Sequence, residues 1–182
     1  MHQSSYIKME SFVRDFSNTK TISKKKVLDF GSYDYNGSYR SLFDDEKWEY
    51  IGVDLQEGPN VDLKVKNPHD WNEINSNEFD LVISGQAMEH CEFFWIVFQE
   101  IYRVLKPNGY TCIIAPSSGP EHRYPVDCWR FYPDGMRAIC KFVGLEVVSV
   151  QTEWDPPNYT DGSEEWRDTT LIAKKTVKKT PK

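Results

Sequence analysis

Short apolar runs alternate with polar loops along most of the chain, and this pattern is typical of strands in a parallel sheet. The run at residues 79–83 is apolar at every position except Asp80, which indicates burial on both faces of the sheet. The other runs are shorter or more mixed. Together they predict strands around Val27 and Leu28 and over residues 49–54, 60–63, 78–84, 110–115, 146–150 and 169–173.

Longer segments carry apolar residues at helical spacing, and each predicts a helix with one buried face. They cover residues 4–19, 92–105 and 133–144, and a shorter helix is expected to begin at Ser38. The sequence K-P-N-G at residues 106–109 is expected to end the second helix, because proline cannot continue it. The buried faces are expected to contain Met9, Phe12, Val13 and Phe16, then Phe94, Val97, Phe98, Ile101 and Leu105, then Met136, Ile139, Cys140 and Val143.

A glycine-containing loop joins the first predicted strand, at Asp29, to the helix expected at Ser38. A strand, such a loop and a helix N-terminus form nucleotide sites in α/β proteins. The glycines allow the backbone to approach the ligand, and free N–H groups point toward it. Gly31 and Gly37 supply two glycines, but the three-glycine fingerprint is incomplete because Tyr33 occupies its middle position.

Four motifs occur in an order and spacing that point to one enzyme family. They are V-L-D-F-G at residues 27–31, Y-I-G-V-D-L at 50–55, F-D-L-V-I-S-G-Q-A-M-E-H at 79–90 and R-V-L-K-P-N-G at 103–109. The chain resembles the class I S-adenosylmethionine-dependent methyltransferases, and most of all the small members known as methyltransferase type 11. The resemblance covers about residues 24–150 and the strand near Thr170. It implies an enzyme with an α/β, Rossmann-like doubly wound sheet, mostly parallel with an antiparallel last strand, and S-adenosyl-L-methionine as cofactor.

The resemblance places this cofactor at the ends of the first, second and fourth strands. Asp54 lies about twenty residues after the glycine loop, where an acid accepts hydrogen bonds from ribose hydroxyls. Asp29 is expected either to bind the cofactor's amino group or to cap the loop. Asn67 stands where most relatives have an acid for the adenine amino group, with His69 and Asp70 as alternatives. The expected cofactor residues are Asp29, Gly31, Ser32, Tyr33, Gly37, Asp54, Leu55, Asn67, Pro68, Ser84, Gly85 and Gln86.

The segment at residues 116–133 predicts the acceptor side of the site, because loops leaving strand ends line the crevice of open α/β sheets. It combines Pro and Gly with many aromatic and charged side chains. His122 in this loop and His90 after the fourth strand are the candidate catalytic bases. The candidate acceptor-binding residues are Arg123, Tyr124, Asp127, Trp129 and Arg130.

Several roles on this side stay open. Arg123 and Arg130 are expected to hold a carboxylate or phosphate of the acceptor, or to pair with Asp127 and stiffen the loop. The N-terminal helix is expected to pack on the sheet, and the resemblance also allows it to act as a lid over the cofactor. The expected reaction is methyl transfer to a small-molecule or sugar-linked acceptor. A non-catalytic cofactor-binding protein is the alternative, because of Tyr33 in the glycine loop and the neutral Asn67.

Length and composition limit the expected number of domains, the partners and the location of the protein. The chain has 182 residues, which suits one domain over residues 1–175, with an N-terminal helix and linker at 1–23 and a basic disordered tail at 176–182. Its formal net charge of −6 argues against a nucleic-acid partner. The four cysteines form no C-x-x-C pair, so reduced thiols, a cytoplasmic location and no metal site are expected. No apolar stretch is long enough to predict a membrane span.

Overall fold

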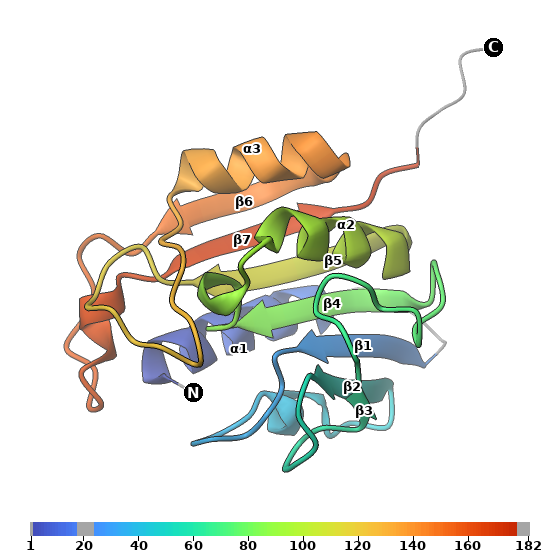
Figure 1. Cartoon of the computed structure of the whole chain (residues 1–182), viewed down its shortest axis with the longest axis horizontal. Helices are drawn as coiled ribbons and strands as arrows, with labels where there is room; N and C mark the ends of the chain where they lie inside the picture. Colours follow the sequence, from blue (N-terminus) through green and yellow to red (C-terminus); the bar gives the residue numbers. More distant parts are fainter. Residues whose placement is uncertain (1, 18–23, 178–182) are drawn as a thin grey trace.

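A seven-stranded sheet forms the middle layer of the protein, in the order β3-β2-β1-β4-β5-β7-β6. A computed structural model describes residues 2–17 and 24–177 of the chain. Its strands are β1 (Lys25–Phe30), β2 (Trp48–Asp54), β3 (Leu63–Lys64), β4 (Phe79–Gly85), β5 (Leu105–Ala115), β6 (Glu146–Thr152) and β7 (Thr169–Lys174). All neighbouring pairs are parallel except those of β7, which runs antiparallel between β5 and β6 (Figure 1). The predicted fold class is confirmed.

Helices cover both faces of this sheet (Figure 1). Helix α1 (Gln3–Ser17) lies on one face, where Met9, Phe12 and Val13 are buried against β1, β4 and β5. Helices α2 (Phe94–Val104) and α3 (Pro133–Val143) lie on the other face. Gly144 ends α3 in the left-handed conformation that glycine tolerates best. The predicted apolar faces therefore pack as expected, although residues 18 and 19 of the first predicted helix lie outside the described residues.

Three elements differ from their predicted bounds near the first strands. The helix expected at Ser38 is only a short 3₁₀ helix, η1 (Arg40–Phe43). The strand expected at residues 60–63 shrinks to the two residues of β3. The first strand begins at Lys25, before the predicted Val27 and Leu28, and there the Lys26 amide donates to Asp80 and its ammonium group pairs with Glu78.

The K-P-N-G sequence also behaves differently from the prediction. Helix α2 ends at Val104, and β5 begins at once, with Leu105 paired to Phe79 of β4. Asn108 then bends the strand with φ +67°, a left-handed value that asparagine tolerates. Proline and asparagine thus lie inside the irregular start of a strand and do not form a separate turn.

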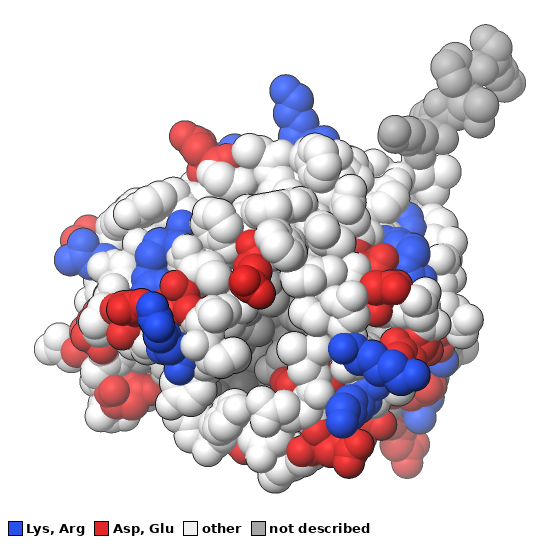
Figure 2. Space-filling view, in the orientation of Figure 1, with Lys and Arg blue, Asp and Glu red and all other residues white. Residues whose placement is uncertain are grey.

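The carboxyl ends of β1, β2, β4 and β5 share one edge of the sheet, because these strands are parallel neighbours. The space-filling view shows a hollow near this edge, which we call the crevice, with mostly uncharged walls and charged side chains around its rim (Figure 2). In the described ranges, 2–17 and 24–177, no helix has the length and apolar character needed to cross a membrane.

Candidate functional site

The loop after β1 is held close to the end of β4. Gly31 has φ +78°, and a Cβ at this position would lie 2.5 Å from the Cβ of Ala87, so only glycine fits without displacement. The Gly31 amide donates to the carbonyl of Val53 at 2.9 Å, and the Ser32 amide donates to the same oxygen at 3.2 Å. The loop therefore turns directly over the ends of β1 and β2, as a cofactor-binding loop must.

Asp29 lies beneath this loop and is only 2% exposed. Its carboxyl group accepts a hydrogen bond from the hydroxyl of Tyr50 on β2. Burial raises the pKa of Asp29 to about 7, although the Tyr50 bond and the nearby Arg40 act in the opposite direction. The geometry thus shows neither predicted role directly, since the carboxyl group bonds to Tyr50 and, among the described residues, accepts no N–H group of the loop.

Asp54 stands at the end of β2 and organises the backbone around it. One carboxylate oxygen accepts the Leu55 amide at 2.7 Å and the Gln56 amide at 3.2 Å. The other accepts the Tyr33 amide at 3.1 Å and so ties the glycine loop to β2. Each carboxylate oxygen has two lone pairs, so the group keeps acceptor capacity for a ribose hydroxyl.

The remaining predicted cofactor residues gather at the same sheet edge, but several use their polar atoms within the protein. The Ser84 hydroxyl donates to the carbonyl of Phe30 at 2.8 Å and is fully buried. Position 85 needs glycine, because a Cβ there would lie 1.9 Å from the hydroxyl oxygen of Tyr39. Two further bonds lie in the glycine loop, where the Ser32 hydroxyl donates to the Asn60 carbonyl and the Gly37 amide donates to the Asp34 carboxylate. Two more follow β3, where the His69 amide donates to the Asn67 side chain and the Trp71 indole donates to the Pro68 carbonyl. Leu55 is 42% exposed at the end of β2.

Gln86 follows β4 and has a buried acceptor that makes no hydrogen bond among the described residues. Its amide nitrogen donates to Asp168 at 2.9 Å, whereas its side-chain oxygen is buried and has no partner among the described residues. Asp168 also accepts a hydrogen bond at 2.6 Å from Ser4, at the start of α1. The positive φ of +58° at Gln86 directs the chain away from β4 at this point.

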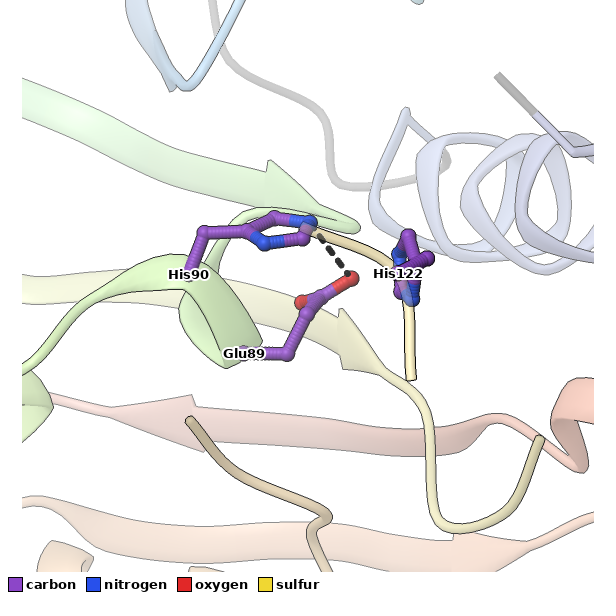
Figure 3. A group of neighbouring side chains, drawn as sticks. All are labelled: Glu89, His90 and His122. Carbon is purple, nitrogen blue, oxygen red and sulfur yellow. Dashed lines mark ion pairs between the residues drawn. The ribbon is translucent and has the colours of Figure 1, made fainter. Parts of the chain in front are cut away.

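Glu89, His90 and His122 form a cluster beside this crevice (Figure 3). Glu89 and His90 come from the short 3₁₀ helix η2 (Met88–His90), and His122 comes from the loop after β5. The two rings and the carboxyl group are turned toward one another, with one potential ligand atom of each within 4.8 Å of the others. The structure therefore brings the two predicted bases together, and adds Glu89 to them.

The electrostatic environment of this cluster disfavours charge on its members. Burial raises the pKa of Glu89 to about 8, and the nearby Asp168 and Asp127 raise it further, whereas Arg130 lowers it. Burial lowers the pKa of His90, and His122 adds to this effect. The carboxylate oxygens of Glu89 have no hydrogen-bond partner in the part of the chain that the structure describes.

Asp127 and Arg130 fix the loop that carries His122. Arg130 donates to both oxygens of Asp127, at 2.6 and 2.8 Å, and to the carbonyl of Pro120 at 2.8 Å. Asp127 in turn accepts the amide of His122 at 2.7 Å. The Arg130 side chain holds the pKa of Asp127 well below its usual range. The structure thus contains the Asp127–Arg130 pair that the loop-stiffening alternative expects, while the exposed Arg123 pairs, among the described residues, with Glu121.

The predicted aromatic residues separate into two places. Tyr124 is 63% exposed and its ring lies 6.1 Å from that of His90 and 6.3 Å from that of His122. Trp129 packs instead on α2, where its indole donates to the carbonyl of Cys91 and its ring contacts Phe94.

Three residues of this region were missed by the sequence interpretation. Glu89 belongs to the motif at residues 79–90, but nothing in the sequence indicates that its carboxyl group is buried. Trp166, whose ring lies 4.6 Å from that of His122, and Asp168, which binds Gln86, come from the segment before β7. That segment follows the loop by more than thirty residues, and no local pattern connects the two.

Comparison with known proteins agrees with this architecture. Residues 28–113 match the family model described as a methyltransferase domain. Over 81 residues the chain is 48% identical to the biotin biosynthesis bifunctional protein BioHC of Saccharophagus degradans; the match covers 41% of this chain and only 14% of that protein.

Solved structures extend the likeness to the whole fold. One is Burkholderia thailandensis 1,6-didemethyltoxoflavin-N1-methyltransferase with bound S-adenosylhomocysteine (TM-score 0.72, 15% identity, 96% of this chain and 80% of that chain). Another is Haemonchus contortus phosphoethanolamine N-methyltransferase 2 in complex with S-adenosyl-L-methionine (TM-score 0.66, 16% identity, 93% of this chain and 53% of that chain). Residues 28–113 thus match a methyltransferase domain and the chain has the fold of the class I methyltransferases, which confirms the resemblance stated from the motifs.

Proposed function

We propose that this chain is an S-adenosyl-L-methionine-dependent methyltransferase that acts on a small-molecule or saccharide acceptor. The observation that carries the proposal is the convergence of two groups of residues at one sheet edge. Gly31, Asp54 and Gln86 lie at the ends of β1, β2 and β4, and the two histidines lie next to them, at the ends of β4 and β5.

The residues on the first side fit the cofactor. Gly31 lets the loop pass close to Ala87 at the start of the segment after β4, and the backbone of this loop is proposed to lie against the methionine part. Asp54 supplies carboxylate lone pairs for the ribose hydroxyls, and the exposed Leu55 beside it supplies an apolar surface for the adenine ring. The unpartnered oxygen of Gln86 supplies a buried acceptor at the end of β4. We extend the proposal to the other cofactor residues expected from the resemblance.

When bound, the cofactor supplies a methyl group on a positively charged sulfur, and transfer requires the acceptor atom, the methyl carbon and the sulfur in line. The protein's contribution is to hold this line and to exclude water. For a hydroxyl acceptor, the acceptor's proton passes to a base, an oxygen lone pair forms the new bond to carbon, and the carbon–sulfur bond breaks. His90 suits the role of base, because its Nδ1 is 2.6 Å from the carbonyl of Val126 and its Nε2 points to the cluster.

Acceptor binding falls to the loop at residues 116–132. Arg123 and Tyr124 are exposed there, and a cation and a phenol ring are the groups that bind carboxylates or phosphates and stack on sugars. The net charge of −6 favours a small acceptor over a nucleic acid. Asp127, Arg130 and Trp129 are proposed to support this surface through the loop contacts described above.

Calorimetric titration with S-adenosyl-L-methionine and S-adenosylhomocysteine tests the cofactor site. Asp54→Ala removes the carboxylate proposed to bind ribose, and hydrogen bonds to a charged group contribute about 1.5–3 kcal/mol, so affinity should fall roughly tenfold to a hundredfold. Asp15→Ala is the matched control, because Asp15 is an exposed acid on α1 that pairs with the exposed Arg14 at 3.6 Å. Equal binding by wild type and Asp54→Ala would refute the assignment of Asp54.

Transfer itself is tested with methyl-labelled cofactor and fractionated small molecules and oligosaccharides from cell extract. Label that appears in an acceptor with wild type and disappears with Asp54→Ala supports the enzyme. Tight cofactor binding without transfer to any fraction would favour the alternative of a non-catalytic cofactor-binding protein.

A further inference from the structure

We propose that Glu89, His90 and His122 form a site for one divalent transition-metal ion beside the crevice. One carboxylate and two imidazoles are a donor set that proteins use for zinc, iron(II) and related ions. The three residues come from two segments more than thirty residues apart in the chain, η2 and the loop after β5, which meet only in the folded protein (Figure 3). The sequence interpretation predicted no metal site, because it considered only the spacing of cysteines.

The spacing of the ligand atoms suits a single ion. Bonds of about 2.1 Å in tetrahedral geometry place two ligand atoms about 3.4 Å apart. The Nε2 atom of His90 is 3.7 Å from a carboxylate oxygen of Glu89, and one ligand atom from each residue lies within 4.8 Å of the others. Small rotations of the side chains therefore bring all three atoms to bonding distance of a common centre.

The carboxyl group of Glu89 is free to bind an ion. Glu89 is fully buried, yet neither of its carboxylate oxygens has a hydrogen-bond partner among residues 2–17 and 24–177. The Nδ1 atom of His122 is also buried and makes no hydrogen bond within the same described ranges, and it lies 3.4 Å from a carboxylate oxygen of Asp127. Leaving a buried carboxyl group without a partner costs free energy, and an ion bound at this position would satisfy it.

His90 is held in the orientation expected of a metal ligand. Its Nδ1 lies 2.6 Å from the carbonyl of Val126, so Nδ1–H is the donor and Nε2 carries the free lone pair. Histidine ligands usually make such a second bond through the other ring nitrogen, which fixes both the tautomer and the ring orientation. The same Nε2 is the atom that faces Glu89.

The surroundings of the cluster favour a cation. Asp127 lies 3.4 Å from His122 and Asp168 acts on Glu89 electrostatically, so two further acids offset the charge of the ion. Arg130 is the nearby positive charge, and it is already paired with Asp127 through two hydrogen bonds.

Three protein ligands leave coordination positions open, and these would face the acceptor side of the crevice. An ion with open positions can bind an acceptor oxygen and lower the pKa of its hydroxyl group, so that the proton is lost to water. His90 then acts as a ligand and not as the base, because its Nε2 lone pair is bound to the ion. This role rests on the proposed methyltransferase function, whereas binding of the ion does not. The test therefore measures the ion without any acceptor.

Purified, metal-free protein is titrated with Co²⁺, and the visible absorption and the stoichiometry are recorded. Wild type should bind one ion, and Glu89→Gln and His122→Gln should each weaken binding at least tenfold, the loss that even an outer-shell partner of a ligand produces. His69→Gln is the control for adventitious binding by histidine, because His69 contacts Phe93 and lies outside the cluster. Cys128→Ser is the corresponding control for binding of Co²⁺ by the exposed thiol of Cys128.

Two further measurements make the outcome decisive. Azide added to the Co²⁺ form should shift the absorption bands if a coordination position is open, and unchanged bands would overturn an acceptor-facing site. Circular dichroism shows that each variant is folded. Absence of saturable binding in wild type, equal binding in both cluster variants, or preference for Mg²⁺ over Co²⁺ would overturn the proposal. Binding of S-adenosylhomocysteine to the same metal-free sample separates this failure from failure of the cofactor site.

Discussion

Asp29 should make the stability of this protein depend on pH in a direction opposite to that of most carboxylates. Its carboxyl group is buried beneath the glycine loop, and burial raises its pKa from an ordinary 3.8 to about 7. Between these values the folded protein keeps a proton that the unfolded chain has lost. Folding therefore becomes less favourable as pH rises through this window, and the cost is complete above pH 7.

The size of the effect follows from the same two values. A pKa difference of about 3, at 1.36 kcal/mol for each pKa unit, corresponds to about 4 kcal/mol over the whole window. Asp29→Asn removes the titration and keeps a side-chain oxygen that can accept the hydroxyl of Tyr50. Its new amide hydrogens cost a constant amount where they lack a partner, about 1–3 kcal/mol, and this cost does not change with pH.

Urea unfolding followed by tryptophan fluorescence measures this effect at several pH values between 4.5 and 8. The free energy of unfolding of Asp29→Asn, relative to wild type, should rise by about 3 kcal/mol from the acidic to the neutral end, because the range begins above the unfolded pKa. Other carboxylates contribute equally to both proteins and cancel. Parallel curves for the two proteins would refute the inference that Asp29 is protonated in the folded state near pH 6.

The same titration reports on the cofactor. If the cofactor's ammonium group binds near Asp29, it favours the carboxylate and lowers the pKa of Asp29. We therefore expect S-adenosylhomocysteine to release on the order of one proton or less on binding near pH 6.5. Calorimetry in two buffers of different ionisation enthalpy measures this release. If no proton is released, Asp29 bonds to Tyr50 and does not interact with the ammonium group of the cofactor.

Two further predictions concern the loops at either side of the crevice. Arg130→Lys should lose the paired hydrogen bonds to the buried carboxylate of Asp127, which costs about 2 kcal/mol and lowers the melting temperature by about 4–8 °C. Arg123→Lys is the control, because it changes an exposed pair and should alter the melting temperature little. Equal shifts of the two variants in scanning calorimetry would contradict the loop-fixing role of Arg130. Gly31→Ala should destabilise by about 1–3 kcal/mol and weaken cofactor binding, because the new Cβ lies 2.5 Å from that of Ala87 and φ is +78°. Adding Ala87→Gly should recover only the steric part, and no recovery in urea unfolding would show that the contact is not the cause.

The fold could be predicted from the sequence largely because its signals are local. Buried parallel strands produce apolar runs, and helices over a sheet produce apolar stripes, so the run at residues 79–83 and the stripe of α2 were both interpreted correctly. The misplaced elements are those whose bounds depend on tertiary contacts. Leu105 is a strand residue because it pairs with Phe79, although its spacing also continues the helix before it.

The candidate site was predictable only on the side where motifs occur. Gly31 and Asp54 are adjacent to strand ends in the sequence, so their common edge follows from the order of the sheet. The internal use of polar groups was not predictable. The hydroxyl of Ser84 binds the carbonyl of Phe30, which lies 54 residues away in the chain, and no local pattern records such a contact.

The acceptor side depends on the last part of the chain as much as on the motifs. The carbonyl of Trp166 accepts the amides of Ser117 and Ser118, both at 3.1 Å, and the hydroxyl of Thr169 donates to the carbonyl of Phe131 at 2.7 Å. These bonds tie both ends of the loop that carries His122 to the segment before β7. Because β7 runs antiparallel to β5, with Thr169 paired to Ala115, that segment reaches the edge where β5 ends. The position of His122 over Glu89 thus requires the inserted antiparallel strand, although none of the four family motifs lies in it.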